Sequence, residues 1–403
     1  MAVARGALLE ALLAHNTRHG VTAAIWGEGA AEAARQAVAA VAGPLPRCAA
    51  EIPPTALRLD TPLDLAYSVR CTAPERLHFP IRGGLPGLDA SPLSLEVALL
   101  KGGRVREWQG YHLLHDQQGG LVPDGSSAYG PLAGGALSGD GVGAPAEPRR
   151  REELAEAFVV CDDLDTTNFC HFVCDLLPKI ALAGECRRGI PIVIEPPSAP
   201  FQRELLARVA ERLGHPIVPL EPGLELAVQR LFYLRRTGHT HPLLRCSGLA
   251  MGWVRQLVDA CPPAAPPGSV LVLRRQRRRV LNEPALIAAL QRLTPRLQVI
   301  DNLETLGVRD QAELVGRHRV LLGAHGAGFT HLLFAREAPQ VAVELMAEGM
   351  GSLAFALISS RLGIEHCIQV GSNVPSAHGV GFPDMEVNPE AVVALLQGAA
   401  GWR

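Results

Sequence analysis

Residues 168–179 follow a predicted strand and place a histidine and an aspartate, His171 and Asp175, four residues apart. On a helix these two side chains share a face. A carboxylate beside an imidazole fixes its tautomer and raises its basicity, which suits a general base that removes a hydroxyl proton. The alternative is a partly buried structural histidine paired with Asp175. Zinc at Cys170, His171 and Cys174 is disfavoured, because the sequence has no second cysteine–histidine pair of ligand spacing.

An arginine-rich run follows the predicted strand 270–273. Its candidate ligand-binding members are Arg274, Arg275, Arg278 and Arg279. Arginines at the carboxyl end of a strand can form forked hydrogen bonds with phosphate oxygens. The alternative is a solvated basic turn.

A glycine-rich run, 323–328, lies between a predicted strand and a predicted apolar helix at 329–336, and its candidate site residues are His325, Gly326, Ala327 and Gly328. Small residues let a phosphate approach the backbone, where the helix N-terminus offers free N–H groups. Tight turns between strand and helix also need glycine for steric reasons. Glu344 ends the next predicted strand, where it could accept hydrogen bonds from ribose hydroxyls or lie in solvent.

The elements that must position these residues alternate between strand-like apolar runs and helical periodicity. Strands are predicted at 158–161, 192–194, 217–218, 270–273, 299–300, 320–322, 341–343 and 368–370, with helices between them. This pattern predicts an α/β fold with mainly parallel sheets. A Pro- and Ala-rich stretch at 262–268 is the predicted linker. The predicted divisions are a helical segment at 1–46, a Rossmann-like domain at 47–261, the linker at 262–268 and a second Rossmann-like domain at 269–403.

Length and composition restrict the class of protein. The 403 residues suit two domains, at roughly 150 residues each. A net charge of -2 gives no basic field, which disfavours a nucleic-acid partner. Nine scattered cysteines indicate reduced thiols, so we expect a cytoplasmic protein. Without an apolar stretch of membrane-spanning length or a recognisable signal peptide, we expect at most peripheral contact with the inner face of the membrane.

Together and in this order, the three segments resemble glycosyltransferase family 61. The resemblance rests on the His171 and Asp175 segment, the arginine run ending at Asn282 and Glu283, and the glycine-rich run. It implies a GT-B architecture, in which two Rossmann-like domains face each other across a cleft. It also implies an inverting, metal-independent reaction that moves a sugar from a UDP-sugar to a glycan hydroxyl in polysaccharide, capsule or glycoconjugate biosynthesis, with no prosthetic group.

The resemblance also implies residue roles. Arg274, Arg278, His325 and the turn from Gly326 to Gly328 would face the diphosphate, and Glu344 would face the ribose. His171 and Asp175 would act from the other domain. Two alternatives remain open: a nucleotide-sugar epimerase or hydrolase, which needs the same phosphate contacts, and a non-catalytic glycan-binding assembly protein.

Overall fold

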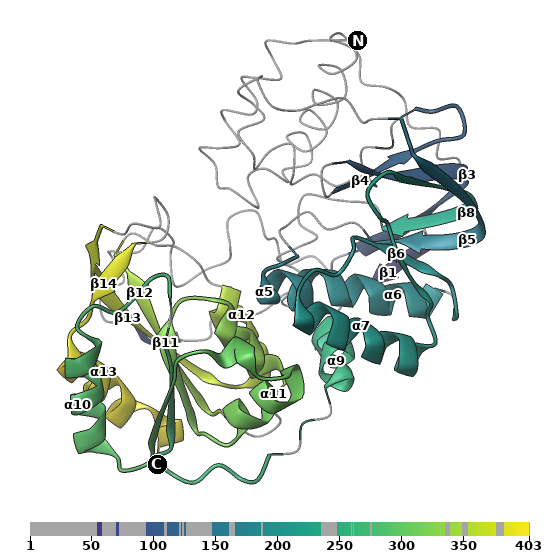
Figure 1. The fold of residues 1–403 in the computed structure, drawn as a ribbon. Helices are drawn as coiled ribbons and strands as arrows, with labels where there is room; N and C mark the ends of the chain where they lie inside the picture. The colour runs from purple at the N-terminus through teal and green to yellow at the C-terminus, as the bar shows by residue number, and fades with distance from the viewer. Residues whose placement is uncertain are drawn as a thin grey trace. The chain divides into compact units, whose positions relative to one another are not determined.

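The computed structural model of the chain describes residues 55–58, 70–71, 94–108, 111–120, 122, 125, 147–160, 166–186, 188–234, 248–258, 260, 262–274, 276–334, 339–348, 354–375 and 383–402. The predicted helical segment at 1–46 lies outside these residues. The chain divides into two compact units, Met1–Thr61 with Ser91–Ala250 and Pro62–Ala90 with Met251–Arg403. Each unit is an α/β structure built on one mixed sheet (Figure 1).

The division between the units differs from the predicted linker. It falls after Ala250, within helix α9 (Gly248–Leu257). The stretch at 262–268 packs in the second unit, where the carbonyl oxygens of Pro266 and Gly268 accept hydrogen bonds from the Ser269 and Thr294 side chains. Segment 62–90 also counts with the second unit, because its strand β2 (Arg70–Cys71) pairs with β13 (Glu365–Val374).

The sheet of the first unit has the order β1-β3-β8-β5-β6-β7, with β4 paired to β3. Its strands are β1 (Thr55–Arg58), β3 (Ser94–Trp108), β4 (Tyr111–His115), β5 (Arg150–Val159), β6 (Ile192–Ile194), β7 (Ile217–Pro219) and β8 (Leu224–Leu234). Strands β8, β5, β6 and β7 run parallel. Strand β3 runs antiparallel to β8, β1 and β4. The predicted parallel arrangement therefore holds for β8, β5, β6 and β7. The antiparallel strands β3, β1 and β4 form the rest of the sheet.

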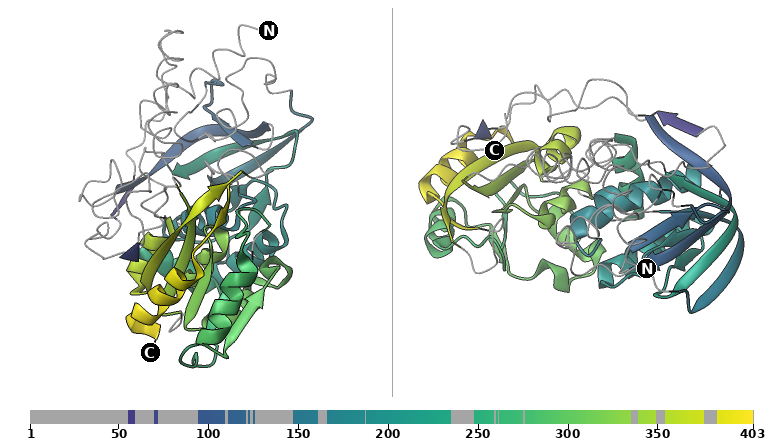
Figure 2. Two further views of the ribbon diagram at one scale, coloured as in Figure 1. Left: turned by 90° about the vertical axis from the view of Figure 1, so that its left-hand side faces the viewer. Right: turned by 90° about the horizontal axis from the view of Figure 1, so that it is seen from above.

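Helices follow the parallel strands of the first unit. The chain forms α5 (Phe169–His171), the π-helical segment η4 (Phe172–Leu176) and α6 (Leu177–Cys186) after β5, and α7 (Pro200–Leu213) after β6. Helix α7 begins at Pro200, where the Gln202 side chain accepts a hydrogen bond from the Ala199 N–H at 2.7 Å. It ends at Gly214, whose φ of 65° is the left-handed conformation that glycine adopts at low cost. Helices α6 and α7 lie along the sheet (Figure 2).

The second unit contains a five-stranded parallel sheet in the order β10-β9-β11-β12-β13, extended by β14 and β2. Its strands are β9 (Val270–Leu273), β10 (Leu297–Ile300), β11 (Val320–Ala324), β12 (Val341–Ala347) and β14 (Asp384–Glu386), besides β13 and β2. In chain order the parallel strands read 2-1-3-4-5, which is a doubly wound topology. The order in which strands are added reverses at β9, because β10 lies on one side of β9 and β11 on the other. Such a switch point opens a crevice beyond the carboxyl ends of the strands.

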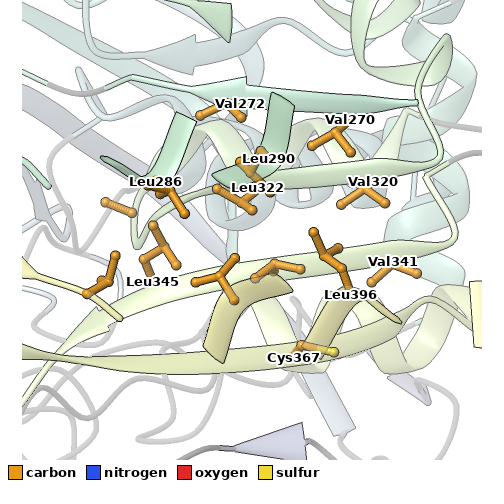
Figure 3. Close-up of a cluster of buried hydrophobic side chains, with 14 of the residues drawn as sticks. Val270, Val272, Leu286, Leu290, Val320, Leu322, Val341, Leu345, Cys367 and Leu396 are labelled. Atoms are coloured by element: carbon orange, nitrogen blue, oxygen red, sulfur yellow. The ribbon is translucent and has the colours of Figure 1, made fainter. Parts of the chain in front are cut away.

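Helices cover both faces of this sheet. Helices α10 (Glu283–Leu293) and α13 (Pro389–Gly398) lie on one face, and α11 (Val308–Gly316) and α12 (Ala354–Leu362) lie on the other (Figure 1). Buried aliphatic side chains fill the space under α10 and α13 (Figure 3). Leu286 and Leu290 of α10 there meet Leu322 of β11, and all three are fully buried. The apolar residues on one side of α10 produce this core.

Candidate active site

A pocket of about 550 Å³ opens at the switch point of the second unit. Strand register explains its position, because Leu273 of β9 lies beside Ile300 of β10 and Gly323 of β11. The residues that follow these three line the pocket together with α10 and the arginine run. The lining consists of Val272, Leu273, Arg274, Gln276, Arg278, Arg279, Val280, Leu281, Glu283, Pro284, Leu286, Asp301, Asn302, Leu322, Gly323, Ala324 and Leu345.

Arg274 lies at the carboxyl end of β9, as predicted, but two carboxylates hold it. Its Nη1 donates to Asp301 Oδ1 at 2.8 Å, and its Nε donates to Glu283 Oε2. These hydrogen bonds, the one with Asp301 first, raise the pKa of Arg274 above its ordinary value. The group of three therefore carries a net charge of one negative, and a phosphate would have to compete with both acids for the guanidinium.

The other arginines of the run have separate roles. Arg279 forms a forked pair with the buried Asp384 of β14, at 2.7 Å and 3.1 Å, and its backbone N–H donates to the same carboxylate. Arg278 has a left-handed φ of 57°, a conformation uncommon for residues other than glycine. Its Nη1 donates to the carbonyl oxygen of His325 at 3.2 Å. Burial lowers the pKa of Arg278, which the charge of Glu344 partly offsets. Arg275 lies outside the described residues.

Gly323 lines the pocket at a position where β9 leaves little room for a side chain. A Cβ there would lie 3.0 Å from the Leu273 carbonyl oxygen and 3.2 Å from the Leu273 Cβ. The turn formed by Gly326, Ala327 and Gly328 leads into a 3-10 helix, η6 (Ala327–Leu333), whose last six residues are buried. Within the described residues, the predicted helix at 329–336 is therefore of a tighter, 3-10 type. Its apolar side chains pack into the core beside α11 and α12.

His325 and Glu344 belong to a buried polar network on the face covered by α12. His325 Nδ1 hydrogen-bonds to Glu344 Oε1, and His366 Nε2 of β13 hydrogen-bonds to Glu344 Oε2 at 2.9 Å. Ser359 of α12 bonds to His366 Nδ1 at 2.9 Å. Burial alone would raise the pKa of Glu344, but the charges and hydrogen bonds of the two histidines lower it to about 2. This geometry does not favour the predicted ribose contact, because both carboxylate oxygens bind histidines and the side chain is fully buried.

The first unit contains the other candidate pair. His171 Nδ1 and Asp175 Oδ2 lie 2.9 Å apart, and Asp175 is fully buried whereas the His171 side chain is 26% exposed. Asn168 caps the helix start, since its side chain accepts from the Cys170 N–H at 2.9 Å. The backbone then forms a π-helical turn from Phe172 to Leu176. Such turns are rare overall, and those that occur often lie at functional sites. The predicted pairing is therefore present, with a partly accessible imidazole oriented by a buried carboxylate.

The protein-family model described as Glycosyltransferase 61 matches residues 169–342. Less than half of the chain is therefore similar to glycosyltransferase family 61. This glycosyltransferase match begins with α5, which carries His171, and includes the arginine run and the glycine-rich turn. It ends just before Glu344, so the network partners His366 and Ser359 lie outside it. No curated protein matches the chain.

Sequence reasoning missed the partners that lie far along the chain from the glycosyltransferase motifs. Asp384 is 105 residues from Arg279, and His366 is 22 residues from Glu344. Neither lies in a recognisable motif. Asp301 follows the predicted strand ending at Ile300, and its place at a strand end in the same sheet was a signal that could have found it.

The described part of the chain contains no group of three or more His, Cys, Asp or Glu residues arranged to hold a metal ion. Asp163 and Asp165, the most obvious alternative metal ligands in the sequence, lie outside the described residues. Among the helices that the structure describes, none combines the length and apolarity needed to span a membrane.

Proposed function

We propose that this protein is an inverting, metal-independent glycosyltransferase that moves a sugar from a UDP-sugar to a glycan hydroxyl. The observation that carries the proposal is the pocket at the switch point of the second unit, which presents arginines, acids and small residues together. Doubly wound sheets bind nucleotides at this position. The UDP donor, the inverting course and the absence of a metal requirement rest on the family resemblance.

The pocket chemistry supports a specific orientation of the donor. Asp301 is exposed at the end of β10 and lines the pocket, so we assign the ribose hydroxyls to Asp301 instead of Glu344. The carboxylates of Asp301 and Glu283 accept hydrogen bonds from hydroxyls, whereas phosphates need positive charge. We assign the diphosphate to Arg278 and to the backbone from Gly323 to Gly326, which includes His325.

His171 supplies the base in this proposal. The acceptor oxygen forms a bond to the anomeric carbon and gives its proton to the imidazole. The bond between the anomeric carbon and the β-phosphate oxygen breaks, and the electron pair stays on the departing diphosphate. Asp175 holds the ring through Nδ1, so that Nε2 takes the proton, and it stabilises the imidazolium that forms. Fixed positive charge stabilises the leaving group.

We further propose a GT-B arrangement, in which the first unit presents His171 and the acceptor to the donor held by the second unit. Each unit by itself has an α/β sheet consistent with this role. The acceptor is then a growing glycan of a polysaccharide or glycoconjugate, and the protein works in the cytoplasm with at most peripheral membrane contact.

Calorimetry with UDP in the presence of EDTA tests the donor site. Wild-type protein should bind UDP, and Arg278→Ala should bind it about ten- to a hundredfold more weakly, since a charge-assisted contact is worth roughly 1.5 to 3 kcal/mol. Arg292→Ala is the matched control, because Arg292 is an exposed arginine of α10 that pairs with Glu390. Its affinity should equal that of wild type. Equal losses in both variants would refute the site.

Product analysis tests the reaction. A panel of UDP-sugars incubated with glycan acceptors and EDTA should yield extended glycan and UDP. Conversion of the donor without any acceptor would instead identify an epimerase or hydrolase. Activity that EDTA abolishes and manganese restores would refute metal independence.

A further inference from the structure

Four polar residues from four neighbouring elements form a continuous chain inside the second unit. His325 follows β11, Glu344 lies on β12, His366 lies on β13 and Ser359 lies on α12. Glu344, His366 and Ser359 are fully buried, while the His325 side chain is 11% exposed. The chain therefore runs from the core outward and ends at one partly accessible imidazole.

The hydrogen bonds determine which nitrogen of His325 meets a ligand. Its Nδ1 is bound to Glu344, and the described residues offer its Nε2 no hydrogen bond. Ionised Glu344 only accepts, so His325 must donate through Nδ1–H. His366 donates to the other carboxylate oxygen through Nε2–H and meets the Ser359 hydroxyl through Nδ1. Because both acceptor oxygens are used, neither ring can turn over without breaking a buried bond.

His325 also borders the proposed donor pocket. It directly follows Ala324, which lines the pocket, and its carbonyl oxygen accepts from Arg278, another lining residue. Glu344 lies at Nδ1 of its ring, the Phe355 ring has its centroid 5.1 Å from that of His325, and the Arg278 guanidinium lies at the His325 carbonyl oxygen. A ligand at Nε2 of His325 therefore binds to a ring whose other nitrogen is held by the buried carboxylate of Glu344.

We propose that Glu344 is a positioning residue for the donor diphosphate: it holds His325 with Nδ1–H inward and places a negative charge beside the ring, so that the ring, when it also carries a proton on Nε2, donates Nε2–H to a phosphate oxygen. The proposal rests on the proposed function. His366 binds the second oxygen of the carboxylate and keeps it from rotating. The histidine thus adds a second cationic donor beside Arg278.

A purely structural role predicts a different result. Glu344→Gln preserves the size of the side chain, and its amide can bond to both rings, one through its oxygen and one through its NH₂ group. It removes the negative charge that lies beside the His325 ring. Ser359→Ala is the matched control, because it breaks the same buried network at its far end and leaves the charge of Glu344 in place.

Calorimetry with UDP on the full chain separates these roles. Glu344→Gln should weaken UDP binding about tenfold or more, the loss of one charge-assisted bond, while Ser359→Ala stays within about twofold of wild type. Circular dichroism and urea unfolding check that each variant is folded. Wild-type affinity in Glu344→Gln, or equal losses in both variants, would overturn the proposal. Should Glu344→Gln fail to fold, His325→Asn takes its place and must show the same loss.

Nitrogen-detected imidazole NMR without any ligand tests, independently of UDP, which nitrogen of His325 carries the proton. The wild-type His325 signal, assigned by its disappearance in His325→Asn, should show a proton on Nδ1, whether or not Nε2 also carries one. A ring protonated on Nε2 alone would refute the positioning role of Glu344 even if UDP binds. Failure of wild-type protein to bind UDP would refute the proposed donor, and with it the diphosphate contact, even if the tautomer is as expected.

Discussion

Replacing His171 with alanine should separate catalysis from donor binding. Loss of a general base typically lowers turnover by roughly 100- to 10,000-fold. UDP affinity should stay within about threefold of wild type, because all residues that line the donor pocket belong to the second unit, whereas His171 belongs to the first. Steady-state kinetics with a UDP-sugar and UDP calorimetry on the same preparation measure both quantities.

Two further variants make the His171 prediction specific. Asp175→Asn keeps the size of a fully buried side chain that lies 2.9 Å from the imidazole but removes its charge, so turnover should fall by at least about tenfold. His215→Gln is the control: this histidine is buried in the same unit, but its ring bonds to the Ile190 carbonyl near the amino ends of β6 and β7. It should cost about 1 kcal/mol of stability and leave turnover unchanged. Full activity in His171→Ala, or a loss of UDP affinity equal to that of Arg278→Ala, would refute the assignment.

Three other predictions concern the second unit. Gly323→Ala places a Cβ 3.0 Å from the Leu273 carbonyl oxygen, so it should cost about 1 to 3 kcal/mol in urea unfolding and weaken UDP binding, whereas Gly252→Ala, with open space at its Cβ, should be neutral or stabilising. Asp384→Asn should weaken UDP binding by less than Arg278→Ala does, because it loosens the arginine run without touching the ligand. An unchanged urea unfolding midpoint in Asp384→Asn would show that the pair of Arg279 and Asp384 does not anchor the arginine run. The pKa of Glu344 is lowered from 4.5 to about 2 by folding, so its contribution is fully present above pH 4.5 and is lost as the pH falls toward 2. Urea unfolding should show a loss on the order of 3 kcal/mol over that window, and Glu344→Gln should lack it.

Much of the second unit was predictable because buried parallel strands are continuous apolar runs. Strand β9 has the predicted bounds, and β10, β11 and β12 each contain their predicted cores. Strand β3 was harder, since Gly102 and Gly103 interrupt its apolar pattern in the manner of a turn. In the structure Gly102 takes a φ of 67° and Gly103 leaves room for Leu231, so the strand continues for 15 residues.

Pairings within one helical turn were also predictable. His171 and Asp175 are four residues apart, and local backbone geometry alone brings them together. Partners from other strands were not, because their proximity depends on strand order and register. Gly323 lies beside Glu344, and Ala342 beside His366, only through the pairing of β11, β12 and β13. Glu344 was consequently predicted to bind ribose hydroxyls or to lie in solvent, although it is the centre of a buried network.

The partners of the arginines also change how much positive charge the candidate site offers. The arginine run suggested several equivalent phosphate ligands, yet Arg274 is shared by two carboxylates and Arg279 is bound to Asp384. A guanidinium already bound to a carboxylate gains little from a phosphate, because it must give up one ionic hydrogen bond to make another. Arg278 donates to the carbonyl oxygen of His325 and lies within the field of Glu344. We therefore predict that loss of Arg278, which has His325 beside it, weakens diphosphate binding more than loss of Arg274 or Arg279.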